Sequence, residues 1–370
     1  MSSHITKVGM PKWGLSMTEG KVMGWLVDEG TAVDEGVEIV EVETVKIAGS
    51  IEAPTSGVLR RRVADTGETI PVGGLVGVIA GAEVPDEDVD AFIAEFHATF
   101  VPLEEAEEAA SLTEMIVVDG RPLRFLRVGE GEPALVLLHG FGGDLNNWLF
   151  NQEKLAEQRA VYALDLPGHG GSAKDVGGFK DLVGALGGFL DDLGVSRACL
   201  TGHSMGGALA LQYALDHPDR VSSLVLIDSA GLGDEINSDY VNGFVEAGNA
   251  RKLREVLRLL FADPDLVTRG MVDDVLRYKR LDGVTEVLRG LAADLFPDGR
   301  QTVALAPRLV EVSAPVLVIW GEADRILPVT HARGLPDHVR VEVLPGKGHS
   351  PHIEAANDVN RLVEQFLSGT

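Results

Sequence analysis

The sequence lacks several features that would place it in well-known classes of protein. Its 370 residues include one cysteine, Cys199, which excludes a disulfide framework and a zinc site built from four cysteines. No apolar run approaches the roughly 18 residues that a membrane-spanning helix needs, and no apolar signal segment follows Met1. We therefore expect a soluble, cytoplasmic protein with no metal site.

Positive charge is also scarce. The chain has 32 Lys and Arg against 57 Asp and Glu, a net charge of −25. Binding to nucleic acid or to an anionic membrane surface needs a basic surface, so we expect neither partner. With 45% hydrophobic and 24% charged residues the chain is globular, and its length suits two or three domains.

The acidic charge is concentrated in one stretch. Residues 81–114 contain 11 acidic side chains and no basic one, which is typical of a self-repelling, extended linker. A short amphipathic helix is expected inside it, because apolar residues recur there at helical spacing: Val89, Phe92, Ile93 and Phe96. We favour packing of this helix on the following domain over docking to a partner protein. The expected parts are residues 1–80, 81–114 and 115–370.

The first part contains an internal repeat. An offset of 37 residues aligns turn residues and glycines of one copy with those of the other: Gly20 with Gly57, Asp28 with Asp65, and Gly30 with Gly67. Short alternating segments separated by glycine turns predict strands, and two copies suit two similar β units packed as a sandwich. Gly30 and Gly67 stand where a turn needs a positive φ. We therefore expect an all-β domain.

Lys46 lies between the two copies, at or near the tip of a predicted hairpin. A solvated surface lysine is the simplest interpretation, but residues 5–80 resemble a lipoyl domain, with VETVK at 42–46 and APTSG at 53–57. The resemblance implies that a lipoate ligase attaches lipoate to Lys46 through an amide. The family usually has Asp where this chain has Val45, which leaves the related biotin domain as an alternative. Biotin acceptors typically flank the lysine with methionines, so we favour lipoate.

From Met115 onward the pattern changes to buried strands alternating with helices. Apolar runs without alternation occur at residues 134–138, 161–164, 198–201, 224–227 and 316–320. Such runs predict a mostly parallel sheet with helices on both faces. A helix-rich insertion at about 231–308 is expected to form a cap over the sheet's C-terminal edge.

A candidate nucleophile follows the third run. Residues 202–206, GHSMG, stand between that strand and a predicted helix, which is the arrangement of a nucleophile elbow around Ser204. Over about 115–366 the chain resembles the α/β-hydrolase fold. The resemblance implies that HGFGG at 139–143 supplies part of the oxyanion hole, with the backbone N–H groups of Phe141 and Met205 as donors.

The order Ser204, Asp324, His349 is that of the α/β-hydrolase triad. Asp228, which ends its own strand, is the alternative acid, and His352 is the alternative base. We favour Asp324 on family order and His349 on its flexible glycine flanks.

The two domains together resemble the E2 components, the dihydrolipoyllysine-residue acetyltransferases, of bacterial acetoin-cleaving systems. The resemblance implies a thiamine-diphosphate-dependent E1, a dihydrolipoamide dehydrogenase E3, and transfer of acetyl from lipoyl-Lys46 to coenzyme A, for which we expect an acetyl-Ser204 intermediate. The usual E2 motif His-x-x-x-Asp-Gly is absent from the sequence. The alternatives are a tethered esterase or thioesterase and a non-catalytic scaffold. Cations that could meet coenzyme A phosphates, or form an ordinary solvated helix face, are Arg251, Lys252, Arg254 and Arg258.

Overall fold

The computed structural model describes residues 5–11, 13, 17–44, 48–100 and 113–369. The chain divides into an N-terminal unit, Met1–Ala110 with Leu266–Met271, and a C-terminal unit, Ser111–Asp265 with Val272–Thr370. Each unit has its own sheets and core and is described by itself. Within the described ranges, no helix combines the length and apolarity that a bilayer crossing requires.

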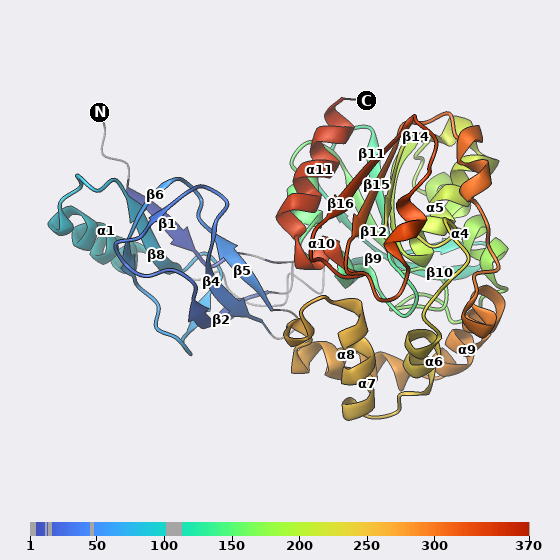
Figure 1. Cartoon of the computed structure of the whole chain (residues 1–370), viewed down its shortest axis with the longest axis horizontal. Helices are drawn as coiled ribbons and strands as arrows, with labels where there is room; N and C mark the ends of the chain where they lie inside the picture. The colour runs from blue at the N-terminus through green and yellow to red at the C-terminus, as the bar shows by residue number, and fades with distance from the viewer. Residues whose placement is uncertain (1–4, 12, 14–16, 45–47, 101–112, 370) are drawn as a thin grey trace. The chain divides into compact units, whose positions relative to one another are not determined.

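The N-terminal unit is a sandwich of two four-stranded antiparallel sheets (Figure 1). The first sheet has the order β1 (Ile5–Gly9), β8 (Leu75–Ala80), β6 (Gly57–Arg62) and β3 (Ala32–Val33). The second has the order β5 (Ala48–Glu52), β4 (Glu38–Glu43), β2 (Glu19–Trp25) and β7 (Thr69–Pro71). Buried apolar side chains from both sheets form one core. The all-β expectation is confirmed.

The two sequence copies make equivalent contacts across this sandwich. Gly30 and Gly67 both have a positive φ, 84° and 91°, as their turn positions predict. The Gly30 N–H donates to the carbonyl of Leu59 at 2.7 Å, and the Gly67 N–H donates to that of Val22 at 2.7 Å. Val22 and Leu59 are themselves 37 residues apart, so the turn of each copy bonds to a strand residue of the other.

Strands β4 and β5 form the hairpin that carries the candidate lipoyl site. They pair antiparallel, with Glu43 opposite Ala48, so residues 44–47 make the connection. Val42 and Ile51 are buried in the core, which anchors both strands of the hairpin. Lys46 itself lies outside the described residues, and its attachment role stays a prediction.

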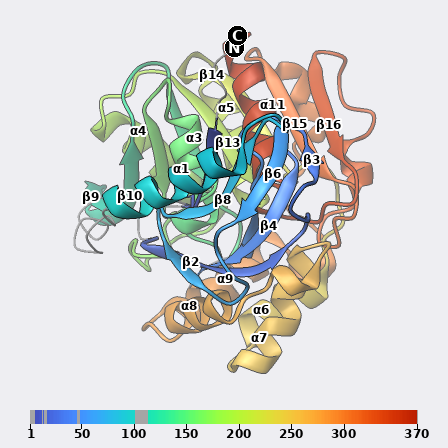
Figure 2. The ribbon, with the colours of Figure 1, turned by 90° about the vertical axis from the view of Figure 1, so that its left-hand side faces the viewer.

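The acidic stretch contains a helix, α1 (Asp86–Thr99), and it packs differently from our expectation. The apolar face of α1 lies on β8 of the N-terminal sandwich rather than on the following domain, as Figure 2 shows. Acidic residues of its first two turns also pair with arginines of β6, at 2.7 Å for Arg60–Asp86 and 3.0 Å for Arg61–Asp90. The expected amphipathic helix is present, but the expectation that it packs on the following domain is wrong, because both its apolar stripe and its charge match the sheet that precedes it.

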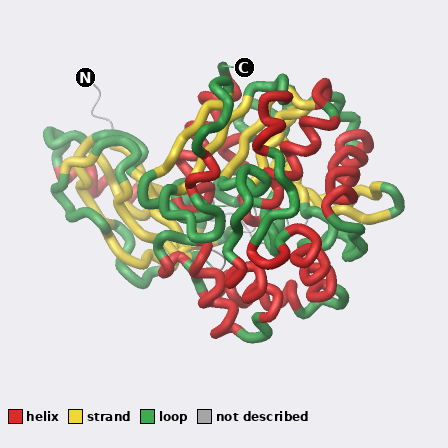
Figure 3. The backbone as a smooth tube through the Cα atoms, turned by 45° about the vertical axis from the view of Figure 1, so that its right-hand side comes forward, coloured by secondary structure: helices red, strands yellow, loops and turns green. Residues whose placement is uncertain are grey.

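The C-terminal unit has an eight-stranded sheet, mostly parallel, in the order β16-β15-β14-β13-β11-β12-β10-β9. Its buried strands match the apolar runs of the sequence: β11 (Ala134–Leu138), β12 (Val161–Leu164), β13 (Ala198–His203), β14 (Val221–Ile227) and β15 (Val316–Gly321). Figure 3 shows these strands flanked by helices. Figure 1 places α4 (Phe179–Asp192) and α5 (Met205–Asp216) on one face and α11 (Ala356–Ser368) on the other. The expected parallel sheet is confirmed.

Three further strands were not predicted: β9 (Thr113–Val118), β10 (Arg121–Val128) and β16 (Val339–Leu344). β9 and β16 are the two edges of the sheet, and β10 adjoins β9. These strands mix charged with apolar residues, so they lack the continuous apolar run of a doubly covered strand. Two short helices, α3 (Gln152–Leu155) and α10 (Pro351–Glu354), complete the unit.

The insertion between β14 and β15 is helical, as the sequence predicts. It contains α6 (Ser238–Glu246), α7 (Ala250–Leu257), α8 (Arg269–Lys279) and α9 (Val284–Leu295), which we call the cap. Buried Lys279 fixes the end of α6, because its ammonium donates to the carbonyls of Phe244 and Ala247. Burial lowers the pKa of Lys279 to about 8.

Candidate active site

Ser204 occupies the sharp turn between β13 and α5. Its backbone has φ 52° and ψ −118°, a conformation that a residue with a side chain rarely adopts. The Ser204 N–H donates to the carbonyl of Ile227 on the neighbouring strand at 3.0 Å, which ties the turn to the sheet. This is the strained strand–turn–helix geometry of a nucleophile elbow.

The glycines of the GHSMG motif are required by close backbone contacts. A Cβ at Gly202 would lie 2.2 Å from the carbonyl oxygen of Gly206, and one at Gly206 would lie 2.3 Å from that of Leu138. Both contacts are with main-chain atoms, which cannot move aside as a flexible side chain could. The motif therefore encodes the elbow itself rather than a flexible loop.

Asp324 and His349 form a buried pair at the ends of β15 and β16. His349 Nδ1 lies 2.8 Å from Asp324 Oδ2, while Asp324 Oδ1 accepts hydrogen bonds from the backbone of Ile326 and Leu327. Burial opposes ionisation of Asp324, but the charge of His349 and these hydrogen bonds together hold its pKa below the usual value. The ionised acid places the imidazole proton on Nδ1, which leaves Nε2 to accept a proton from a nucleophile.

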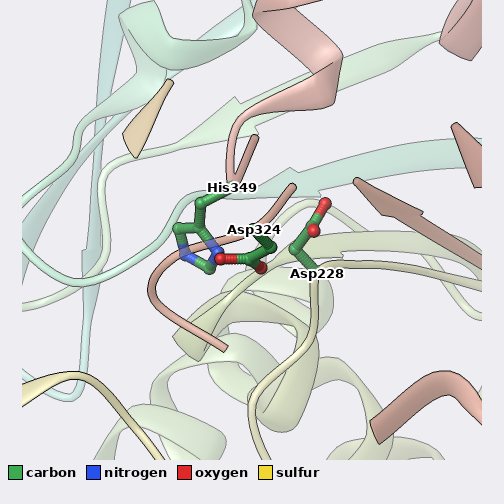
Figure 4. Close-up of side chains that lie close together, drawn as sticks. All are labelled: Asp228, Asp324 and His349. Carbon is green, nitrogen blue, oxygen red and sulfur yellow. The ribbon is translucent and has the colours of Figure 1, made fainter. Parts of the chain in front are cut away.

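The two alternative residues lie close by but in other roles. Figure 4 shows Asp324 facing His349, with Asp228 beside it, and the structure therefore favours Asp324 as the acid. Asp228 accepts from the Gly321 N–H at 2.9 Å. His352 packs its ring against those of His203 and Trp148, at centroid distances of 4.4 and 4.7 Å. Burial lowers the pKa of His352 to about 3, so this ring is neutral.

His203 connects the elbow to the loop of the base. Its Nε2–H donates to the carbonyl of His349 at 2.7 Å, across 146 positions of sequence. Burial, with the nearby rings of His352 and His349, lowers the pKa of His203 well below its usual value, so the ring is neutral. The sequence alone does not predict this bond, because nothing in the motif identifies a partner so distant along the chain.

The expected oxyanion-hole segment lies next to Ser204. A Cβ at Gly140 would be 3.1 Å from Ser204 Cβ, which places the backbone of Phe141 beside the nucleophile. Met205 is the first residue of α5, where an N–H has no carbonyl partner within its own helix. The two predicted donors thus flank Ser204, and their role in binding an oxyanion stays a prediction.

Hydrogen bonds of His139 hold the oxyanion-hole segment, 139–143, against the loop that contains Leu166. His139 donates through Nδ1–H to the Gly140 carbonyl at 2.8 Å, and its Nε2 accepts from the Leu166 N–H at 3.1 Å. Asp165, at the start of the Leu166 loop, pairs with Arg124 at 2.6 Å. Burial lowers the pKa of His139 to about 4, so it acts here as a neutral connector. The segment that begins at Asp165 therefore supports the loop of His139 structurally.

The cap covers the site from the opposite side. Tyr240 of α6 donates to the Phe141 carbonyl at 3.4 Å, and the rings of Phe244 and Phe296 lie 5.9 and 6.1 Å from that of Phe141. A small apolar pocket beside Met205 is lined by residues of α5, α9 and the segment that follows α9. These surroundings are largely apolar and limit the access of water.

The candidate cations for coenzyme A lie on α7 of the cap. Arg251 and Lys252 are exposed, while Arg258 pairs with Glu255 of its own helix at 3.1 Å. The helix buries Leu253 and Leu257 on its other face. This is the ordinary amphipathic arrangement that we gave as the alternative, and nothing in the geometry ties these cations to Ser204.

Comparisons with known proteins agree with both units. Residues 133–356 match the model of the α/β hydrolase fold, and residues 6–79 match a model described as biotin-requiring enzyme. A solved meta-cleavage product hydrolase from Pseudomonas fluorescens superposes with a TM-score of 0.64 at 24% identity, over 70% of this chain and 99% of its own. That likeness shows the fold alone.

Two relatives extend over the whole chain. The dihydrolipoyllysine-residue acetyltransferase component of the acetoin cleaving system of Cupriavidus necator is 47% identical, over 100% of this chain and 99% of the relative. The component of the same name from Pseudomonas putida is 49% identical over 99% of both chains. The chain belongs to this family of acetyltransferase components. Its fusion of a lipoyl-type domain to an α/β-hydrolase domain is therefore an architecture that it shares with those two relatives from end to end.

Proposed function

We propose that the protein transfers acetyl from a lipoyl group on its own Lys46 to coenzyme A, as the acetyltransferase of an acetoin-cleaving multienzyme complex. A buried, hydrogen-bonded His349–Asp324 pair in an α/β-hydrolase fold carries the proposal, together with Ser204 on a strained elbow whose neighbour His203 bonds to the His349 carbonyl. This arrangement activates a serine for acyl transfer. The partners would be the thiamine-diphosphate-dependent E1 and the dihydrolipoamide dehydrogenase E3 of that complex, with a lipoate ligase acting on Lys46.

The N-terminal unit suits a covalent carrier. Between Glu43 and Ala48, which face each other across the hairpin, the chain has a connection of the length that hairpin turns use. Lys46 lies in that connection, and both strands beside it are anchored in the core. When attached there, lipoate supplies the acyl group as a thioester.

In the first step Ser204 forms an ester with the acyl group. Its Oγ attacks the thioester carbonyl while His349 Nε2 takes the hydroxyl proton, and Asp324 stabilises the resulting imidazolium. The backbone N–H groups of Phe141 and Met205 donate to the developing oxyanion. The carbon–sulfur bond then breaks, and His349 returns the proton to the departing thiolate.

In the second step the thiol of coenzyme A takes the acyl group from the serine. His349 Nε2 accepts the thiol proton as the sulfur attacks the ester carbonyl. The carbon–oxygen bond breaks, and the proton passes from His349 to Ser204 Oγ, which restores the enzyme. Tyr240 and Phe296 cover Phe141 and so limit the access of water from that side.

The test is acetyl-CoA formation from acetyl-dihydrolipoamide by the full-length lipoylated protein. Ser204→Ala should lower the rate by several orders of magnitude, because the oxyanion hole and substrate binding alone leave only a small residual rate. Ser196→Ala, an exposed serine of the same unit, is the matched control and should keep the normal rate.

Three other outcomes would overturn the proposal. A normal rate in Ser204→Ala would place the transfer at another site. Release of acetate by the wild type at the same rate with and without coenzyme A would make the protein a thioesterase. No turnover with either acceptor would leave the hydrolase fold as a scaffold for the carrier.

A further inference from the structure

Asp228 is a buried carboxyl group that the mechanism above does not use. It ends β14, is 0% exposed, and has an oxygen, Oδ2, with no hydrogen-bond partner among the described residues. One oxygen each of Asp228 and Asp324 and one ring nitrogen of His349 all lie within 4.8 Å of one another (Figure 4). An unpaired carboxylate at such a place would cost several kcal/mol, so the position needs a physical explanation.

The backbone holds Asp228 there at some cost. Its φ is 41°, in the left-handed region, and its N–H donates to the Ile319 carbonyl at 2.9 Å. Ser204, at the end of the adjacent strand, is also strained, with φ 52°. Strain of this kind persists where the surrounding structure imposes it, and it gathers at functional sites. Two strained residues at neighbouring strand ends therefore belong to one site.

We infer that Asp228 is a positioning residue of the triad: a protonated carboxylic acid that backs Asp324 and can take its place beside His349. The inference rests on the proposed roles of Ser204, His349 and Asp324. As a neutral acid, Asp228 presents Oδ1 to the Gly321 N–H at 2.9 Å and has a proton to donate toward the Asp324 carboxylate. It supports the ionised acid without adding a second negative charge.

The charges around Asp228 agree with a neutral group. Burial raises the pKa of Asp228 well above its usual value, and the neighbouring carboxylates of Asp324 and Glu354 raise it further. Two carboxyl groups this close cannot both ionise at low cost, so the proton stays on the one that lacks a cationic partner. Asp324 has His349 as that partner at 2.8 Å. If Asp324 is removed, Asp228 becomes the acid within reach of the ring.

The test is a double-mutant cycle read by the rate at which a fluorophosphonate labels Ser204 in the full-length protein. Asp324→Ala should slow labelling by about 10²–10³-fold, less than the roughly 10⁴-fold that loss of the orienting acid typically costs. Adding Asp228→Asn in that background should slow it a further 10-fold or more. Asp228→Asn alone should cost only a few-fold, because the amide still donates toward Asp324 and accepts from Gly321.

The pH dependence separates this role from a structural one. In Asp324→Ala, labelling should rise with pH as Asp228 loses its proton, facing His349 and Glu354 as the remaining charged neighbours. The rise should be smaller in the double variant, which lacks the contribution of Asp228. Asp181→Asn, which breaks a pair with Arg121, is the matched control and should change the rate by the same factor in both backgrounds.

If Asp228→Asn slows the labelling of Ser204 by the same factor with and without Asp324, Asp228 is merely structural and the inference is overturned. Identical pH profiles of Asp324→Ala and the double variant would also overturn it. Thermal unfolding of each variant shows whether lost labelling reflects lost folding, and Asp228→Glu offers a second variant that keeps the carboxyl. Normal labelling of Ser204→Ala would refute the triad as well. Normal labelling of the wild type without acetyl-CoA formation would refute only the proposed acceptor.

Discussion

The two units differ in what their interiors contain. Among the described residues, the β-sandwich of the N-terminal unit buries apolar side chains alone, whereas the α/β-hydrolase domain also buries many polar and charged ones, from His139 to Asn360. Burying a polar group costs free energy unless it is hydrogen-bonded, so a fold keeps such groups inside only where something depends on them. The contrast indicates that the proposed carrier needs only a stable hairpin, whereas the proposed transferase needs polar side chains that are buried and held by hydrogen bonds.

The contrast predicts first that a mutation at one candidate site leaves the chemistry of the other site intact. Lys46→Ala should abolish the single lipoyl adduct completely and leave fluorophosphonate labelling of Ser204 intact, because the residues that activate Ser204 all lie in the C-terminal unit. Intact mass of protein from a lipoate-competent cell measures the adduct. Lys21→Ala is the control. A biotin adduct, or an adduct that survives Lys46→Ala, would overturn the assignment of the first unit.

A Gly→Ala substitution at one buried glycine in each unit compares how tightly the two units constrain their backbones. Gly206→Ala would press a Cβ against the Leu138 carbonyl at 2.3 Å, so we expect a loss of about 3 kcal/mol or more together with loss of labelling. Gly20→Ala would place its Cβ 2.7 Å from the thioether of Met10 and 2.8 Å from Cγ1 of Val42, which are side-chain atoms that can shift, and should cost about 1–2 kcal/mol. Denaturant unfolding measures both losses. Equal losses would show that the elbow is no more constrained than the sandwich.

Acid should act on the units unequally. Buried histidines with lowered pKa values, about 4 for His139 and about 3 for His352, are neutral when folded but protonate near pH 6.5 when unfolded. Their contribution to stability is fully present above pH 6.5 and is lost as pH falls toward the folded values, by about 1.4 kcal/mol per pH unit and imidazole.

Calorimetry between pH 7 and pH 5 should therefore show the transition of the C-terminal unit falling while that of the N-terminal unit changes little. His352→Phe should reduce the pH slope by one proton, whereas His97→Gln, on α1, should not. A parallel fall of both transitions would contradict this account.

The smallest expected effect concerns α1. Arg61→Ala removes the pairs with Asp86 and Asp90, which are partly exposed, and should cost less than about 1 kcal/mol. Hydrogen exchange within α1 should nevertheless rise, because Arg61 is one of two arginines that fix its first turns to β6. Lys154→Ala, which breaks a surface pair in the C-terminal unit, is the control. Unchanged exchange would mean that the apolar contacts of α1 suffice.

Sequence reasoning recovered the features that local patterns encode. The glycine repeat predicted both turns of the sandwich, and the apolar runs predicted the five central strands of the C-terminal sheet. The motif order favoured Asp324 over Asp228, and the structure pairs Asp324 with His349. These features depend on residues close together in the chain or on a fixed order along it.

What the sequence did not reveal depends on distant partners. Nothing near His203 indicates its bond to the His349 carbonyl, and nothing near Asp228 indicates the crowding that keeps it neutral. The apolar stripe of α1 indicates that the helix packs on something but does not identify the surface, which in the structure is β8, with ion pairs to arginines of β6. Edge strands such as β16 were not predicted from the sequence, because their alternating charged residues resemble those of a surface loop.

The most direct test of the central claim is to trap the acyl group on the enzyme. The lipoylated protein would be mixed with acetyl-dihydrolipoamide, quenched in acid, digested, and analysed by mass spectrometry with and without a chase of coenzyme A. We predict one acetyl group on the peptide that contains Ser204, discharged by coenzyme A much faster than by buffer, and absent from Ser204→Ala. An acetyl group that forms on no serine while acetyl-CoA still accumulates would contradict the account.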